Sequence, residues 1–197
     1  PEGFAANPDL VYEFYNARRR ALRAVEPNPA HRALARLERE IGARGGRVTL
    51  VTQNVDDLHE RAGSAAPVHM HGELAKARCG ACGDIHLCTD DLCVALACPV
   101  CGAAGAMRPH VVWFGEIPLF MDEIAAALAE ADHFVSVGTS GSVYPAAGFV
   151  ADARALGIQR TELNLEPSEN AALFTDRVYG KAGEIVPLWV DRLLARL

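Results

Sequence analysis

Two cysteine pairs constrain this 197-residue chain more than any other feature of its sequence. Cys79 and Cys82 form one Cys-x2-Cys pair, and Cys98 and Cys101 form a second, with fifteen residues between the pairs. Each pair can present two thiolates from a tight turn, so that four thiolates fill the tetrahedral shell of one zinc ion. Because no coordination position is left open, the sequence predicts one structural Zn²⁺ in a small ribbon, with disulfide pairing as the alternative.

The remaining cysteines and the composition indicate an ordinary globular protein in a reducing compartment. Cys88 and Cys93 lie between the pairs, and we interpret them as core-filling residues or spare thiols, with metal ligation by one of them as an alternative. Half of the residues are apolar and the net charge is −6. An acidic chain argues against a nucleic-acid partner, which would require a basic face. No apolar run has the length of a membrane span, so we expect no membrane partner.

The pattern of apolar residues along the chain predicts alternating helices and strands. The expected helices cover residues 10–25, 30–41, 121–131, 145–156 and 185–197. The expected strands cover residues 47–52, 68–71, 110–114, 133–138 and 160–165. This alternation is typical of an α/β fold, a doubly wound parallel Rossmann-like sheet, here with an inserted small zinc-ribbon domain. We expect the Rossmann-like domain over residues 1–72 and 109–197 and the zinc module over residues 73–108.

The first predicted helix carries an arginine among its apolar residues. Its two adjacent stripes consist of Leu10, Phe14, Ala21 and Val25, and of Val11, Tyr15, Arg18 and Leu22. Arg18 lies in line with the second stripe, whereas Arg19, Arg20 and Arg23 are expected to point outward. Because a buried charge without a partner is costly, Arg18 in this position requires an anionic partner. Tyr15 is three residues away and shares its helical face.

Three polar clusters are expected at one edge of the sheet, where the carboxyl ends of parallel strands meet and ligands gather. They consist of Gln53, Asn54, Val55 and Asp56, of Gly138, Thr139 and Ser140, and of Asn164, Leu165 and Glu166. The first cluster can hydrogen-bond a ribose or a carboxamide, or it can instead cap the helix that follows. The second can bring backbone N–H groups to a nucleotide, and Glu166 can accept from two ribose hydroxyls.

His71 is a candidate general base. It lies between a predicted strand and a glycine, beside the zinc module and near the first polar cluster. An imidazole titrates near neutral pH and can take a proton from a hydroxyl group. The alternative is a histidine with a purely structural role.

Taken together, these motifs resemble those of the sirtuins, the NAD-dependent protein lysine deacylases. The matching motifs are Thr52-Gln53-Asn54-Val55-Asp56-Asp57-Leu58-His59, His71-Gly72-Glu73, the two cysteine pairs, Val112-Trp113-Phe114-Gly115-Glu116, Gly138-Thr139-Ser140 and Asn164-Leu165-Glu166. They occur in the order and at the spacings of the family, and the resemblance extends over essentially all of the chain.

The resemblance implies NAD as cofactor and a role for each motif. His71 would be the base that activates a ribose hydroxyl, Asn54 and Asp56 would line the pocket for the nicotinamide end, and Ala182 would lie beside the adenine. The residues implied to bind NAD are Gln53, Asn54, Val55, Asp56, Gly138, Thr139, Ser140, Asn164, Leu165, Glu166 and Ala182. The implied reaction gives free lysine, nicotinamide and O-acyl-ADP-ribose, and the zinc ion takes no part in it.

The resemblance also implies how the substrate is bound. The acyl-lysine peptide would pair as a strand with Val112, Phe114, Gly115 and Glu116. The helix over residues 9–25 would form the acyl pocket, because its Tyr15 and Arg18 resemble the Tyr-x-x-Arg pair of class III sirtuins. In that class the pair binds the distal carboxylate of succinyl- and malonyl-lysine. A structural ion pair is the alternative for Arg18.

Sirtuins have a first strand and a glycine-rich loop before the point that corresponds to Pro1, so we expect the chain as given to lack that part of the NAD site. Two other functions remain as hypotheses, a sirtuin-fold mono-ADP-ribosyltransferase and a non-catalytic reader of acylated lysine. His71 together with Asn54 and Asp56 argues against a reader, which needs no base beside a nicotinamide pocket. Tyr15 with Arg18 favours deacylation. The resemblance further leads us to expect a cytoplasmic monomer.

Overall fold

The computed structural model describes all of residues 1–197 and divides the chain into two compact units. Unit 1 consists of Pro1–Glu26, Thr52–Asp57 and His69–Leu119. Unit 2 consists of Pro27–Val51, Leu58–Val68 and Phe120–Leu197. Both units are therefore built from three separate segments of the sequence. The predicted division into residues 1–72, 73–108 and 109–197 stays a prediction.

Unit 2 contains a parallel three-stranded sheet in the order β6-β7-β8. Its strands are β6 (His133–Val137), β7 (Gln159–Asn164) and β8 (Asp176–Tyr179). The connections contain the short 3-10 helices η1 (Ala146–Gly148) and η2 (Ala171–Leu173) and the helix α6 (Phe149–Ala155). His133 pairs with Gln159 and Thr161 with Asp176, both in parallel register. The expected α/β fold with a parallel sheet is confirmed.

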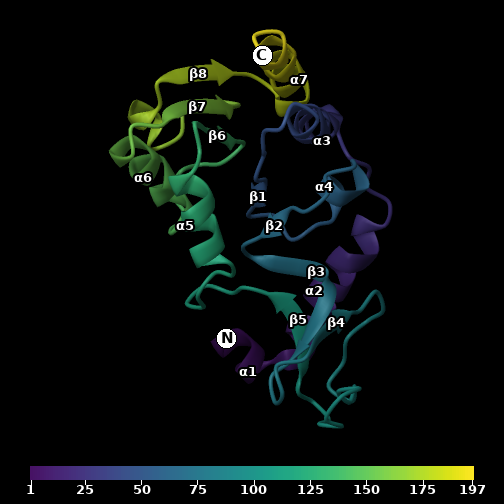
Figure 1. The fold of residues 1–197 in the computed structure, drawn as a ribbon. Coiled ribbons are helices and arrows are strands. Elements are labelled where there is room, and N and C mark those ends of the chain that lie inside the picture. The colour runs from purple at the N-terminus through teal and green to yellow at the C-terminus, as the bar shows by residue number, and fades with distance from the viewer. The chain divides into compact units, whose positions relative to one another are not determined.

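The core of unit 2 is apolar and is built on two long helices. Figure 1 shows α3 (Pro29–Gly42) and α7 (Ala182–Leu194) side by side. Asn28 begins α3 as its N-cap, because its side chain accepts a hydrogen bond from Ala30 N–H at 2.8 Å. The buried cluster consists of Ala30, Ala33, Leu37, Leu163, Val186, Val190 and Leu194. Unit 2 also contains α4 (Leu58–Arg61) and α5 (Met121–Ala129).

Unit 1 contains an antiparallel three-stranded sheet in the order β4-β3-β5. The strands are β3 (Gly72–Cys79), β4 (Ile85–Leu87) and β5 (Met107–Val111). A short helix α1 (Glu2–Ala6) precedes α2 (Pro8–Leu22), which lies against β3 and β5 (Figure 1). The Tyr12 hydroxyl of α2 donates to the carbonyl of Met107 at 2.5 Å, which joins the helix to β5.

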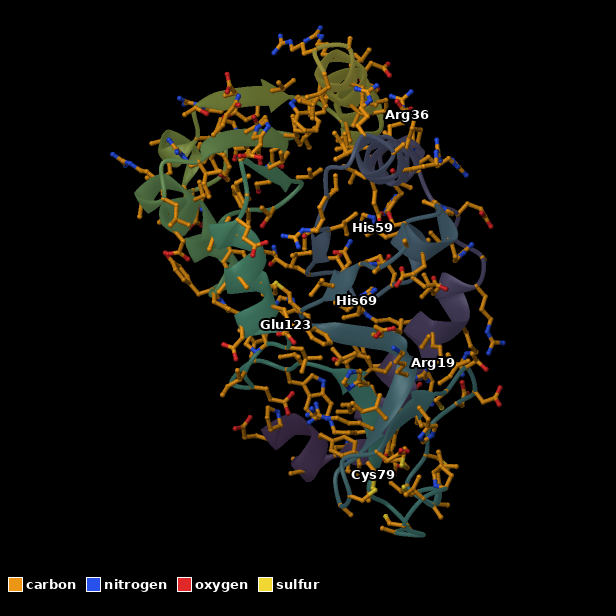
Figure 2. The ribbon with its side chains drawn as sticks, in the orientation of Figure 1. Arg19, Arg36, His59, His69, Cys79 and Glu123 are labelled. Atoms are coloured by element: carbon orange, nitrogen blue, oxygen red, sulfur yellow. The ribbon has the colours of Figure 1, made fainter.

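The buried face of α2 differs from the sequence-based prediction. Arg19 was expected to point outward, but it is 3% exposed, whereas Leu10 and Phe14 are 60% and 50% exposed. Arg19 donates through Nε to the Leu74 carbonyl at 3.0 Å and through Nη1 to the side chain of Asn16 at 2.8 Å. Figure 2 shows Arg19 where α2 faces β3. The prediction was wrong because these buried carbonyl and amide groups require donors, which apolar side chains cannot supply.

Several predicted strands are shorter or displaced. Of the strand expected over 47–52 only β1 (Val51–Thr52) forms, and it pairs with β2 (Val68–His69). The strand expected over 110–114 ends at Val111, because the next residues enter a turn that is described below. No helix of the structure has both the length and the apolar character needed to cross a membrane.

Candidate functional site

The four knuckle cysteines gather at one end of unit 1, where Figure 2 shows Cys79 at the end of β3. Their sulfur atoms all lie within 4.8 Å of one another. Cys79 and Cys101 have a sulfur–sulfur distance of 3.8 Å, and Cys82 and Cys98 one of 3.7 Å. A tetrahedron with zinc–sulfur bonds of about 2.3 Å has edges of about 3.8 Å, so the cluster fits Zn²⁺. A disulfide bond would require about 2.05 Å.

The two knuckles have the same local geometry. In each, the first cysteine sulfur accepts a hydrogen bond from the backbone N–H two residues later, at 3.4 Å. In each, the carbonyl of the first cysteine accepts from the glycine four residues later, at 3.0 Å for Cys79 and 2.9 Å for Cys98. The N–H groups that donate to sulfur stabilise the thiolate form, which is the form that binds a metal. Cys88 and Cys93 lie outside the cluster, so the predicted set of four ligands is supported.

The closely spaced thiols differ in acidity. Backbone N–H groups, chiefly that of Cys82, lower the pKa of the Cys79 thiol to about 7. The backbone N–H of Asp84 favours the Cys82 thiolate, but burial and the neighbouring cysteines together raise the pKa of this thiol to about 12. Four thiolates at these distances repel one another, and a divalent cation would remove that repulsion.

His71 is held by the segment that follows β1. Its Nδ1 lies 3.1 Å from the carbonyl oxygen of Gln53. Since a carbonyl can only accept, Nδ1 carries the proton in this contact and Nε2 is left as an acceptor, the tautomer that a general base needs. Within this segment the Asn54 N–H donates to Thr52 Oγ1 at 3.1 Å, and the Leu74 N–H of β3 donates to the Val55 carbonyl at 2.7 Å, which joins the segment to β3.

Gly72 allows the chain to pass close to β5 directly after His71. Its φ is +80°, and a Cβ atom at this position would lie 2.1 Å from the carbonyl oxygen of His110. Only glycine fits both the backbone conformation and the space. The His71 carbonyl accepts from Val112 N–H at 2.9 Å, so the candidate base and the start of the predicted peptide-binding segment are directly joined.

The segment 112–116 forms a turn that is closed by Glu116. The Glu116 N–H donates to the Trp113 carbonyl at 2.9 Å, and the Glu116 carboxylate accepts from Trp113 N–H at 2.8 Å. Phe114 at the tip is 90% exposed. Arg108 and Arg78 both bind the carboxylate, at 2.6 Å and 2.9 Å. Although burial acts in the opposite direction, hydrogen bonds from Arg108 and from the Trp113 N–H lower the pKa of Glu116 to about 2.

Tyr15 of α2 lines an apolar cavity of about 440 Å³, whereas Arg18 lies against the exposed ring of Phe14. The cavity is lined by Phe4, Leu10, Phe14, Tyr15 and Trp113, among others. The Tyr15 hydroxyl accepts from the Trp113 indole N–H at 2.8 Å. Arg18 is exposed, with its guanidinium carbon 4.4 Å from the centroid of the Phe14 ring. Its expected burial is therefore wrong, and its guanidinium is open to solvent.

In unit 2 the structure brings the ends of β6 and β7 together. The Asn164 side chain donates to the Thr139 carbonyl at 2.7 Å and accepts from Leu165 N–H at 2.9 Å. The Gly138 N–H donates to the Leu163 carbonyl, which continues the parallel ladder into the loop. The Ser140 hydroxyl binds that of Ser142 at 2.6 Å.

The remaining candidates of unit 2 lie at neighbouring element ends. Glu166 is exposed in the loop after β7, and Ala182 is the first residue of α7. The Gly180 N–H donates to the Asn164 carbonyl at 2.9 Å, which joins the end of β8 to that of β7. The clusters 138–140 and 164–166 are thus neighbours, as expected for the carboxyl edge of a parallel sheet.

One residue that supports this edge was not predicted. Glu162 is 1% exposed inside β7, where its carboxylate accepts from Ser168 N–H at 3.1 Å and from the Tyr179 hydroxyl at 2.8 Å. It therefore fixes the loop that carries Glu166. The available signal was a carboxylate between Thr161 and Leu163 in the middle of a predicted strand of the sheet, where burial requires hydrogen-bond partners.

The fold and the site define the class of the protein. It is an α/β protein in which one unit holds a parallel sheet, and the other holds a four-cysteine cluster that fits zinc and a histidine whose Nδ1 lies against a backbone carbonyl.

Comparisons with known proteins identify the family. The Sir2 family model matches residues 1–145. An NAD-dependent protein deacylase of Caulobacter vibrioides is 61% identical over 197 residues, which are 100% of this chain and 83% of that protein. One of Leishmania major is 54% identical over 98% of this chain and 81% of its own length. A crystal structure of a Sir2 homologue with NAD matches with a TM-score of 0.88 and 34% identity, over 100% of this chain and 75% of that one. The chain belongs to the Sir2 family, and the resemblance to the sirtuins is confirmed.

Proposed function

We propose that this chain is an NAD-dependent protein deacylase that removes acyl groups from protein lysines and gives nicotinamide and O-acyl-ADP-ribose. The observation that carries the proposal is the His71–Gln53 contact, which leaves Nε2 of the imidazole as a proton acceptor. Family membership and the names of the relatives support the same activity. A reader of acylated lysine has no use for such a base.

Each part of the chain has a separate task in this proposal. NAD, when bound, supplies the ribose to which the acyl group is transferred. His71 takes a proton from a ribose hydroxyl at Nε2, while the Gln53 carbonyl keeps the ring in position. Asn54 and Asp56 orient the nicotinamide end. Gln53 binds the nicotinamide ribose, Thr139 and Ser140 contact the phosphate and ribose region, Asn164 and Glu166 hold the adenosine ribose, and Ala182 lies beside the adenine. Val55, Gly138 and Leu165 are further cofactor-binding residues.

The acyl group is bound by α2. We propose that Tyr15 and Arg18 bind the distal carboxylate of succinyl- or malonyl-lysine and that acetyl-lysine is a further substrate. Arg18 suits this task because it is exposed and rests on the Phe14 ring, so an incoming carboxylate need not displace a buried partner. Val112, Phe114, Gly115 and Glu116 pair with the peptide backbone, and the Glu116 carboxylate also closes their turn by accepting from Trp113 N–H.

The test is mass spectrometry of a succinyl-lysine peptide incubated with the full-length protein, with and without NAD. We expect O-succinyl-ADP-ribose only with NAD, and its loss in His71→Tyr. The matched control is His86→Gln in the zinc ribbon, where the His86 ring binds Asp84 at 2.9 Å; it is expected to retain the product. ADP-ribose transferred to a protein acceptor, without deacylation, would instead favour the ADP-ribosyltransferase hypothesis.

A cytoplasmic monomer remains our proposal for the state of the protein. It rests on the resemblance to bacterial sirtuins, and sedimentation together with cell fractionation would test it.

A further inference from the structure

The Tyr15 hydroxyl, beside the apolar cavity, accepts a hydrogen bond from Trp113, and this contact leaves its proton to donate elsewhere. Trp113 reaches it with the indole N–H, at 2.8 Å from Nε1 to the phenol oxygen. An indole N–H can only donate, whereas a phenol has one proton and accepts through its oxygen. Since the oxygen is already accepting from Trp113, the phenol proton is left for another acceptor. A carboxylate accepts only, so it complements a hydroxyl that is arranged in this way.

Trp113 is itself held on several sides. The guanidinium carbon of Arg108 lies 3.3 Å from the centroid of the indole ring, in a cation–π contact. Phe4 of α1 packs against the same indole with a centroid distance of 5.3 Å. The backbone N–H of Trp113 donates to Glu116. Both the ring and the backbone of Trp113 are therefore fixed, and its N–H has little freedom to turn away from Tyr15.

Two arginines of the antiparallel sheet complete the support. Arg108 of β5 binds both oxygens of Glu116, at 2.6 Å and 3.0 Å, and donates to the Val111 carbonyl at 2.9 Å. Arg78 of β3 binds the same carboxylate at 2.9 Å. These bidentate, charge-assisted contacts are well defined in direction. They connect the sheet through Glu116 and Trp113 to Tyr15, a residue 98 positions away from Trp113 in the sequence.

We propose that Trp113 is a positioning residue that directs the Tyr15 hydroxyl toward the distal carboxylate of a dicarboxylic acyl-lysine and thereby sets acyl selectivity. The inference rests on the proposed deacylase function and deepens it. Arg18 supplies charge, but it is exposed and its guanidinium contacts only a neighbouring ring, so direction must come from the hydroxyl. An acetyl group ends in a methyl and carries no carboxylate, so it gains nothing from that direction.

The test is a double-mutant cycle on the full-length protein, with kcat/KM measured for succinyl- and acetyl-lysine forms of one peptide. Trp113→Phe keeps an aromatic ring against Phe4 and Arg108, although a smaller one, and removes the indole donor. We expect the succinyl-to-acetyl ratio of kcat/KM to fall roughly tenfold, as for the loss of one hydrogen bond to a charged group, mainly through the KM for the succinyl peptide. Tyr15→Phe is expected to lower the ratio as well. Adding Trp113→Phe to Tyr15→Phe should not lower it further.

Each result decides the question. Equal losses for the two peptides, or multiplicative losses in the double variant, would show that Trp113 has only a structural role. Glu116→Gln is the second variant, because it weakens the arginine contacts while leaving the indole donor. It should lower the succinyl-to-acetyl ratio by a smaller factor, and an unchanged ratio would contradict the support assigned to Glu116. If the unaltered protein removes neither acyl group, the deacylase proposal itself fails, which is distinct from a ratio that does not respond.

Discussion

Units 1 and 2 bury different kinds of side chain. In unit 2, α3, α7 and β7 meet in a cluster of alanine, valine and leucine. In unit 1, the inner face of α2 presents Tyr12, Asn16 and Arg19, and two cysteine ligands complete the small core. Unit 2 is thus stabilised mainly by removal of apolar surface from water, whereas unit 1 adds to its apolar core directed bonds to buried carbonyls and four cysteines that fit a metal. The two units can therefore unfold under different conditions.

The largest expected effect is on the zinc ribbon. Cys98→Ser, or chelation of the metal, is expected to unfold unit 1, because binding of a structural zinc contributes on the order of 10 kcal/mol to folding. Hydrogen exchange followed by mass spectrometry should show loss of protection in β3, β4 and β5 and retained protection in α3 and α7. Cys93→Ser is the control, since this exposed thiol lies outside the cluster. Equal loss in both units would remove the distinction between them.

A smaller effect is expected at the polar face of α2. Arg19→Leu should lower the free energy of unfolding by about 3 kcal/mol, because the buried Leu74 carbonyl loses its donor and the partly buried contact with the Asp90 carbonyl is lost as well. Arg18→Leu, one residue earlier on the exposed face, should change it by less than about 0.5 kcal/mol. Urea unfolding of the two variants would measure the difference. If Arg18→Leu were the more destabilising of the two variants, the buried face of α2 would be the one that the sequence pattern predicted.

The smallest expected effect is a pH dependence confined to unit 1. The pKa of Glu116 is lowered to about 2 in the folded protein, so its contribution to stability is complete above the ordinary value of 4.5 and is lost as the pH falls toward 2. We expect roughly 1–2 kcal/mol over this window, because solvent reaches part of the ion pair. The quantity to measure is the difference in unfolding free energy between the unaltered protein and Glu116→Gln at each pH, since zinc release affects both alike. A difference that does not shrink on acidification would contradict the assignment.

The same contrast explains what could be predicted from the sequence. The helices over 30–41 and 185–197 were predictable, because their apolar residues recur with the helical period and form the face that packs in the core of unit 2. The cysteine cluster was predictable, because the spacing within each knuckle fixes its geometry locally. The inner face of α2 was not, because the partners of Arg19 are 55 and 71 residues away in the sequence. For the same reason no pattern indicated the Trp113–Tyr15 bond, and β3 was missed because its charged residues interrupt the apolar run.

The discontinuity of the units has a consequence for synthesis on the ribosome. The chain passes from one unit to the other after Glu26, Val51, Asp57, Val68 and Leu119. When α2 leaves the exit tunnel, the strands that bury its polar face are still untranslated, and they are complete only once Val111 has emerged. The apolar face of α3 is likewise buried only after α7 has been synthesised. Neither unit can therefore complete its folding before synthesis of the other has begun. A nascent chain stalled near residue 100 would expose the inner faces of α2 and α3 to chaperones.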